Sequence, residues 1–189
     1  MQYLKLGTLL ILLAMTQQPL AATITTDPAL SDSYQIVRVS DVIDSGDAER
    51  LEQVLHQAST SGKPLMIHMD SRGGDVDVSM AMGRIIRQYQ ATTTHGYCAS
   101  SCVFAFLGGS QRLMSNNSGA MLYVHRPELA EAYVANPTAF GKQMLDMLRD
   151  YIVSMTGSAA LYDTMMTIPF SNPRTLCYNE AQSMNVVTQ

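Results

Sequence analysis

Two short segments of this 189-residue chain carry side chains suited to nucleophilic catalysis. The first, Cys98-Ala99-Ser100-Ser101-Cys102, lies between a β-branched run that predicts a strand and an apolar stretch that predicts a short buried helix. At such a turn, which we call the elbow (residues 98–102), a serine hydroxyl is exposed beside the positive end of the helix dipole. The second segment holds His125, which ends another predicted strand two residues before Pro127. This pairing predicts a nucleophile and its general base.

Two adjacent glycines follow the predicted strand that precedes the elbow. They are Gly73 and Gly74, and they lack the side chains that would keep a ligand away from the backbone. The carboxyl ends of parallel strands form the ligand-binding edge of an open sheet, so the glycine loop and the elbow are expected to meet there. We interpret the loop as one that directs backbone N–H groups toward a bound ligand.

Hydrophobic periodicity predicts one α/β domain over residues 35–189, with strands and helices alternating along much of the chain. This order predicts a mostly parallel sheet with right-handed crossovers. The expected strands are 35–39, 65–69, 92–97, 111–114, 120–124 and 186–187, with a turn at 116–119. The expected helices lie near 45–58, 78–89, 103–107, 140–155, 159–166 and 180–184.

The N-terminal residues have the pattern of a secretory signal peptide over residues 1–22. Lys5 precedes an apolar run, Leu6 to Met15, and Leu20-Ala21-Ala22 offers small residues for cleavage. The run is much shorter than the roughly 20 residues needed to span a bilayer. We therefore expect a periplasmic or secreted protein that begins with a flexible leader at 23–34, although a buried helix of the domain is an alternative for the first segment.

The three cysteines are Cys98, Cys102 and Cys177. In an oxidising compartment one disulfide and one leftover thiol are expected. Cys98 and Cys102 flank Ser100 at a bend, and we predict that they are bonded, with a bridge to Cys177 as the alternative. No metal site is expected, because Cys98 and Cys102 lack a second ligand pair at zinc spacing.

The composition is that of an ordinary globular protein, with 47% hydrophobic and 15% charged residues and a net charge of −4. Its twelve lysines and arginines are scattered, so no nucleic-acid partner is expected. No cofactor is expected either.

From residue 36 to 187 the chain resembles the proteolytic subunit of Clp and its exported relatives, in the Clp protease/crotonase superfamily. The family's Gly-x-Ala-x-Ser segment is matched by Gly96-Tyr97-Cys98-Ala99-Ser100, which selects Ser100 over Ser101. Its His-Gln-Pro is matched by His125-Arg126-Pro127, and its Ser-Pro-Gly-Gly by Ser71-Arg72-Gly73-Gly74. Its closing Leu-Ser-x-x-Glu-Ala resembles Leu176-Cys177-Tyr178-Asn179-Glu180-Ala181.

The resemblance implies a repeated β-β-α superhelix with a mostly parallel sheet and a long helix after the catalytic histidine. It implies that Ser100 attacks a carbonyl and that the N–H groups of Gly73 and Ser101, with Gly74 in the same loop, hold the oxyanion. The family's catalytic aspartate has no counterpart here. A Ser-His dyad, a triad with Asn172 and a triad with a displaced Asp163 all stay open.

These expectations together describe a serine peptidase acting on peptides or unfolded chains outside the cytoplasm. No ATPase partner is expected, because an exported protein has no ATP supply. The resemblance also allows a homo-oligomer built through the long helix. Two alternatives remain: a non-catalytic exported binding module on the same fold, and a crotonase relative acting on acyl-CoA or other thioesters. The natural substrate is not defined by the sequence.

Overall fold

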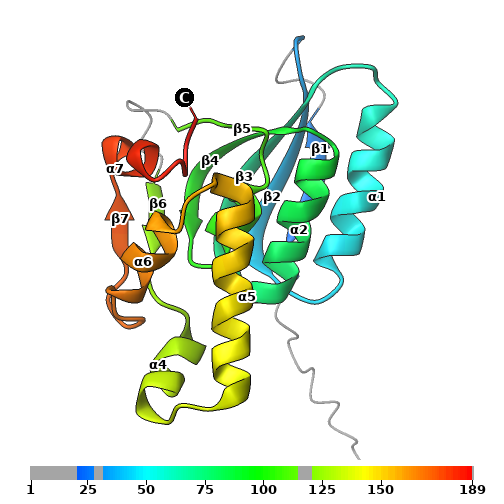
Figure 1. Ribbon diagram of the computed structural model, residues 1–189. Helices are drawn as coiled ribbons and strands as arrows, with labels where there is room; N and C mark the ends of the chain where they lie inside the picture. The colour runs from blue at the N-terminus through cyan, green and yellow to red at the C-terminus, as the bar shows by residue number, and fades with distance from the viewer. Residues whose placement is uncertain (1–20, 28–31, 115–120, 189) are drawn as a thin grey trace, which may run out of the picture.

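The computed structural model describes residues 21–27, 32–114 and 121–188, and these residues form a seven-stranded sheet flanked by helices (Figure 1). The strands are β1 (Thr23–Asp27), β2 (Gln35–Ile43), β3 (Leu65–Gly74), β4 (Thr92–Ala99), β5 (Gln111–Arg112), β6 (Met121–Val124) and β7 (Arg174–Leu176). The helices are α1 (Asp47–Ser59), α2 (Val76–Gln88), α3 (Cys102–Leu107), α4 (Glu128–Ala135), α5 (Ala139–Thr156), α6 (Ala160–Met166) and α7 (Tyr178–Ser183). The turn expected at 116–119 and nearly all of the expected signal peptide lie outside the described residues.

The strand order is β1-β2-β3-β4-β6-β7, and β5 pairs with β4 beside this path. The pairs β2/β3, β3/β4, β4/β5 and β4/β6 are parallel, whereas β1/β2 and β6/β7 at the two edges are antiparallel. This confirms the α/β class and the mostly parallel sheet. The parallel strands all run toward one edge, where Gly73 and Gly74 end β3, the elbow joins β4 to α3, and His125 follows β6.

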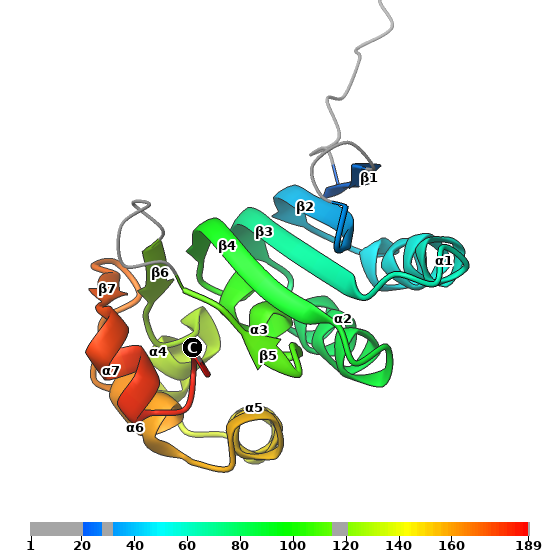
Figure 2. The ribbon, with the colours of Figure 1, turned by 90° about the horizontal axis from the view of Figure 1, so that it is seen from above.

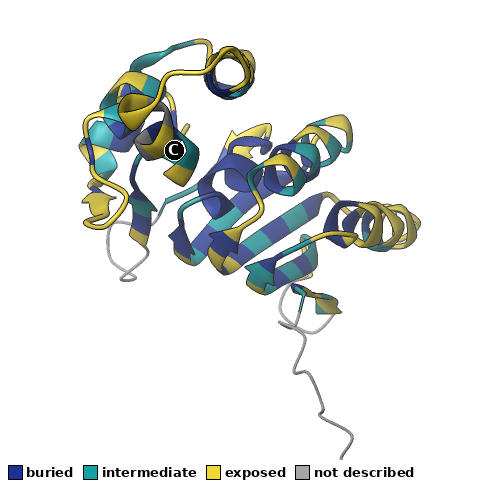
Figure 3. Cartoon of the chain, turned by 90° about the horizontal axis from the view of Figure 1, so that it is seen from below, coloured by how far each residue is buried: buried dark blue, intermediate teal, exposed yellow. Residues whose placement is uncertain are grey.

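The core lies between the sheet and the helices packed on one of its faces. Figure 2 shows α1, α2 and α3 on the same side of β2, β3 and β4, and Figure 3 shows the buried residues gathered where these layers meet. Along β3 the side chains alternate, so that Leu65, Ile67 and Met69 are buried under the helices. Every residue of α3 is buried, as expected for the apolar stretch after the elbow.

The long helix expected near 140–155 is α5. Thr138 caps its first turn by accepting a hydrogen bond from the N–H of Gly141, and Gly157, with φ 74°, ends it in the left-handed conformation. The Tyr151 hydroxyl donates to the Phe104 carbonyl oxygen at 2.6 Å, which joins α5 to α3. None of the helices in the described ranges is long and apolar enough to cross a membrane.

The flexible leader expected at 23–34 is wrong over its first five residues, which form β1. Thr23–Asp27 pairs antiparallel with β2, and the β-branched residues of this run favour an extended strand. Ala22 just before it is buried: its N–H donates to Asp47 at 3.0 Å, and its carbonyl accepts from Arg50 at 3.0 Å. The described fold therefore includes the last residues of the expected signal peptide.

The strand expected at 186–187 is also wrong. Val186 and Val187 are buried but unpaired with any strand, because the Arg112 guanidinium donates to the carbonyls of Val186 and Asn185 instead. Strand β7 and helix α4, which lie on either side of α5 and α6 in the chain, were not among the expected elements.

Candidate active site

The elbow places Ser100 in a backbone conformation that side chains rarely adopt. Ser100 has φ 57°, in the left-handed region, which costs a residue with a side chain roughly 1–2 kcal/mol. Its N–H donates to the carbonyl oxygen of Tyr123 in β6 at 2.9 Å, and this bond fixes the turn to the neighbouring strand. The hydroxyl is half-buried and makes no hydrogen bond to the described residues, so it is available to a substrate.

The disulfide predicted across the elbow is present. Cys98, near the end of β4, is bonded to Cys102, the first residue of α3, and both are fully buried. The covalent loop therefore encloses Ser100 and limits how far the turn can open. Cys177 is an exposed free cysteine at the start of α7.

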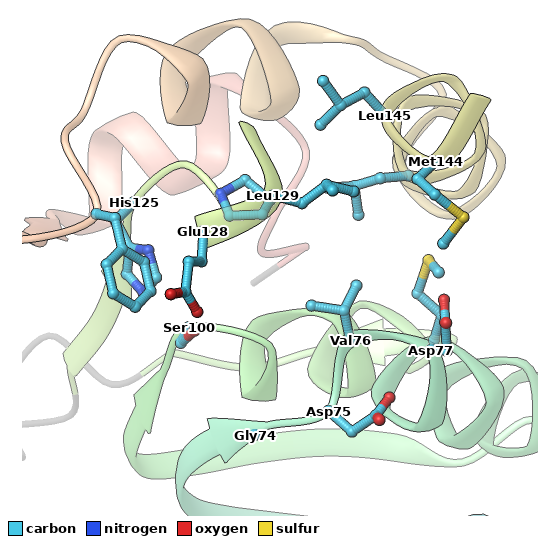
Figure 4. A pocket seen from close by; sticks show the side chains of 14 residues that line it. Gly74, Asp75, Val76, Asp77, Ser100, His125, Glu128, Leu129, Met144 and Leu145 are labelled. Atoms are coloured by element: carbon cyan, nitrogen blue, oxygen red, sulfur yellow. The ribbon is translucent and has the colours of Figure 1, made fainter. Parts of the chain in front are cut away.

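The register between β4 and β6 brings His125 to the elbow. Ala99 pairs with Tyr123, so the residues that follow the two strands lie side by side at the sheet edge. Ser100 and His125 both line one cavity of about 470 Å³, and Figure 4 shows them together at the same end of it. The predicted nucleophile and base thus occupy a common site.

His125 is held by a backbone carbonyl and an aromatic ring. Its Nδ1 lies 2.8 Å from the carbonyl oxygen of Arg126, and because a carbonyl only accepts, Nδ1 carries the proton. In the neutral imidazole this tautomer leaves Nε2 with the free lone pair that a general base requires. The ring of Phe170 packs edge-on against the imidazole with centroids 4.9 Å apart, and the N–H of Arg126 donates to Ile168 at 2.9 Å.

Neither of the two expected partners of His125 contacts it in the described residues. Asn172 is exposed, its backbone N–H donates to Pro169 at 3.1 Å, and its side chain makes no hydrogen bond there. Asp163 is exposed on α6 and does not line the cavity. Phe170, two residues before Asn172, is the residue of this segment that reaches the imidazole.

The glycine loop lies directly against the elbow. Gly73 has φ 86°, and a Cβ at this position would lie 2.6 Å from the Ala99 carbonyl oxygen and 2.8 Å from the Ser101 nitrogen. The absence of a side chain is therefore required for the two backbones to approach so closely. The Gly73 N–H donates to Ser71 Oγ at 3.1 Å, and the Gly74 N–H to Ser101 Oγ at 2.8 Å.

Ser101 is a structural link as well as a neighbour of the predicted nucleophile. Its side chain is buried, accepts from Gly74, and lies 3.0 Å from Ser79 Oγ. Ser79 in turn donates to the carbonyl of Asp75 at 2.7 Å, so the Ser101 hydroxyl is the donor in its contact with Ser79. This chain of bonds connects the elbow, the glycine loop and the start of α2.

The remainder of the cavity is formed by residues that the sequence motifs did not identify. One wall comes from the start of α2 and the other from α4 and α5 (Figure 4). The apolar lining consists of Val76, Met80, Pro127, Leu129, Met144, Leu145, Leu148 and Phe170. The acidic lining consists of Asp75, Asp77 and Glu128. Helical periodicity in α2 and α5 marked apolar faces but not which positions border an opening.

The described residues contain no group of three or more histidine, cysteine, aspartate or glutamate side chains placed to hold a metal ion. His95 precedes Gly96 in β4 and is buried. Its ring packs edge-on against Phe106, with the ring centroids 5.0 Å apart. Burial lowers the pKa of His95, and it does not line the cavity.

Comparison with known proteins places these features in a family. The model of the Clp protease family matches residues 28–157, a range that holds the glycine loop, Ser100 and His125. ClpP1 from Listeria monocytogenes has a similar fold, with 21% identity, a TM-score of 0.58, and coverage of 80% of this chain and 88% of that one. An asparagine-to-aspartate mutant of that protein gives 20% identity, a TM-score of 0.57 and the same coverage. None of the curated proteins matches. The expected ClpP-like fold is confirmed, and the chain belongs to the Clp protease family, whose members are serine peptidases.

Proposed function

We propose that this protein is an exported serine peptidase that cleaves peptides or already unfolded chains without ATP. The observation that carries the proposal is the cavity shared by Ser100 and His125, which follow adjacent parallel strands. The strained conformation of Ser100 supports it, because strain of this kind is concentrated at functional sites. The apolar walls suit a large aliphatic or aromatic substrate side chain.

In the proposed reaction, Ser100 Oγ attacks the substrate carbonyl while His125 Nε2 accepts the hydroxyl proton. The same nitrogen then returns the proton to the leaving amine, and a water hydrolyses the acyl-enzyme by the reverse sequence of proton transfers. The N–H groups of Gly73 and Ser101 stabilise the oxyanion, each contributing on the order of 3 kcal/mol in the transition state. Gly73 must then release or share its bond with Ser71.

The orientation of His125 is assigned to the backbone. The Arg126 carbonyl accepts from Nδ1, the position that a carboxylate occupies in a complete triad. A carbonyl fixes the tautomer but stabilises the imidazolium less than a full negative charge does. We therefore propose a Ser-His dyad, in which Asn172→Ala has little effect on turnover.

The location outside the cytoplasm rests on the signal-peptide pattern of residues 1–22. Intact-mass measurement on protein from the native host tests it, with a product beginning close to Thr23 expected. Cleavage after Ala22 would remove the two hydrogen bonds that Ala22 makes to Asp47 and Arg50, whereas cleavage before it would keep both. A full-length product would contradict export.

A fluorophosphonate probe, which forms a covalent bond with activated serines, tests the catalytic proposal. We expect the purified protein to be labelled and to hydrolyse unstructured peptides at a rate that added ATP does not change. Ser100→Ala and His125→Ala should each abolish both activities, because members of one catalytic unit fail together. Absence of labelling in the unaltered protein would instead favour a binding module, for which the missing carboxylate is the supporting observation.

A homo-oligomer is proposed through α4 and α5. Val134, Phe140 and Met147 are large apolar residues of these helices and are 64%, 66% and 43% exposed. Phe140 and Met147 are seven residues apart and therefore share one face of α5, and exposed apolar residues gathered on one face mark interaction surfaces. Light scattering of Phe140→Ser beside the unaltered protein tests this, since a change in mass is expected only if the helices form the contact.

A further inference from the structure

The cavity has an acidic lining in addition to its apolar walls. Asp75, Asp77 and Glu128 line it, and the described lining includes no lysine or arginine. Figure 4 shows the Glu128 carboxylate extending from α4 toward Ser100, with Asp75 and Asp77 on the opposite wall. The carboxylates thus lie on both sides of the space that a substrate would occupy.

Helix capping accounts for only one of these carboxylates. Asp75 is the N-cap of α2, and its side chain accepts a hydrogen bond from the N–H of Val78 at 2.9 Å. Asp77 and Glu128 are exposed, and within the described residues neither side chain makes a hydrogen bond or an ion pair. Both occupy first turns of helices, where the dipole favours an acid by a few tenths of a kcal/mol to about 1 kcal/mol, but this does not require them to border a cavity.

The electrostatic consequence follows from the shape of the site. A cleft with low-dielectric walls concentrates the field of the charges that line it, so uncompensated carboxylates attract cations and repel anions. The apolar residues Val76, Leu129 and Met144 supply such walls between the acids. A substrate with a bulky apolar side chain and a neighbouring positive charge would satisfy both kinds of lining.

We propose that Asp77 and Glu128 make this site selective for cationic peptides, in which a lysine or arginine adjoins a large apolar residue. The proposal rests on the function proposed above, because it assigns the class of substrate for the same cavity. Asp77 and Glu128 act as specificity determinants and take no part in the chemical step.

The test measures binding to Ser100→Ala protein, which cannot cleave the ligand. Two fluorescent peptides that differ only in one side chain, Leu-Lys against Leu-acetyl-lysine, have the same length and differ by one charge. Fluorescence anisotropy should give a Kd up to about fivefold lower for the lysine peptide at low ionic strength, as expected when one ammonium group interacts with exposed carboxylates. Raising the salt concentration should reduce this ratio.

Two double variants in the same background separate a local effect from a change of net charge. Asp77→Asn/Glu128→Gln should bring the ratio of the two Kd values close to one. Glu49→Gln/Glu52→Gln removes the same two charges from the exposed face of α1, outside the cavity, and should leave the ratio unchanged.

Four results would each overturn the proposal. The first two are no binding of either peptide and equal affinity for both. The others are a preference for lysine that survives Asp77→Asn/Glu128→Gln, and a preference that is lost equally in the Glu49/Glu52 control. Probe labelling of the unaltered protein is judged separately. If the protein binds the lysine peptide selectively but is not labelled, the proposed selectivity stands and the proposed peptidase activity is refuted.

Discussion

Ser100 and Ser101 are adjacent serines whose replacement by alanine should have opposite effects on activity and stability. Ser100 Oγ faces the cavity and makes no hydrogen bond to the described residues. Ser101 Oγ is buried and accepts from the N–H of Gly74 while it contacts Ser79. The proposed nucleophile is thus the serine without structural bonds, and its neighbour is the serine that holds the elbow.

The magnitudes follow from these bonds. Ser100→Ala removes no intramolecular hydrogen bond and keeps a side chain at the same positive φ, so the free energy of unfolding should change by less than about 0.5 kcal/mol. Ser101→Ala leaves the Gly74 N–H without its partner and removes the contact with Ser79, whose hydroxyl keeps its bond to Asp75. This should lower the free energy of unfolding by about 1–3 kcal/mol. Labelling should vanish in Ser100→Ala and fall by no more than about tenfold in Ser101→Ala, which keeps its backbone N–H.

Urea denaturation and fluorophosphonate labelling, carried out on the same two preparations, give both quantities. Loss of labelling in Ser101→Ala with retention in Ser100→Ala would reverse the assignment of the nucleophile. A stable Ser101→Ala together with a destabilised Ser100→Ala would refute the structural reasoning, even if the catalytic assignment held.

Three further predictions concern the surroundings of the site. Replacing Cys98 and Cys102 together with serine should lower the free energy of unfolding by about 2 kcal/mol, and an unchanged urea midpoint would contradict this. Burial lowers the pKa of His95 from 6.5, so below about pH 6.5 the unfolded chain binds a proton that the folded protein does not. Stability should then fall with decreasing pH, by at most about 1.4 kcal/mol per pH unit for one proton. His95→Leu should flatten that slope and exposed His56→Gln should not. Gly73→Ala should destabilise by more than about 2 kcal/mol, since its Cβ would lie 2.6 Å from a carbonyl oxygen of the elbow; a stable variant would show that the loop can move aside.

The elements predicted well from sequence are those whose pattern is local. Helix α5 has periodic apolar residues, a threonine cap and a terminal glycine, and β3 begins with a short apolar run directly after Pro64. The strands β1 and β7 have five and three residues, too few for a clear pattern, and they are held by pairing with distant strands. Helix α4 could have been predicted, because Pro127 and Glu128 precede an alanine-rich run, as is typical of a helix start.

In the candidate site, too, the residues in local motifs were predictable and the contacts between distant segments were not. Ser100, His125 and the two glycines stand in short motifs, so their types and spacing were sufficient to predict that they meet. Phe170 lies 45 residues from His125 in a segment without a regular pattern, and nothing local predicts that its ring contacts the imidazole. The role of the Arg126 carbonyl is equally hidden, because any residue type supplies that oxygen.

Within the described residues no carboxylate orients His125, and the backbone contacts of the elbow indicate how such a site could still catalyse a reaction. The disulfide, the bond from Ser100 to Tyr123 and the close approach of Gly73 all restrict the turn that presents the proposed nucleophile. They fix the position of the proposed attacking oxygen and of the N–H groups. In a serine peptidase with a damaged triad, the N–H groups of the oxyanion hole and substrate binding supply the activity that is retained. They do not stabilise the imidazolium, which in a complete triad is the task of the carboxylate. We therefore expect slow turnover in which binding in the cavity, rather than the strength of the base, determines which peptides are cleaved. Introducing a carboxylate at position 172 tests this. If the new side chain of Asn172→Asp reaches His125, the rate of probe labelling should rise. Unchanged labelling would mean that the segment bearing Phe170 holds the new carboxylate of the variant away from the imidazole.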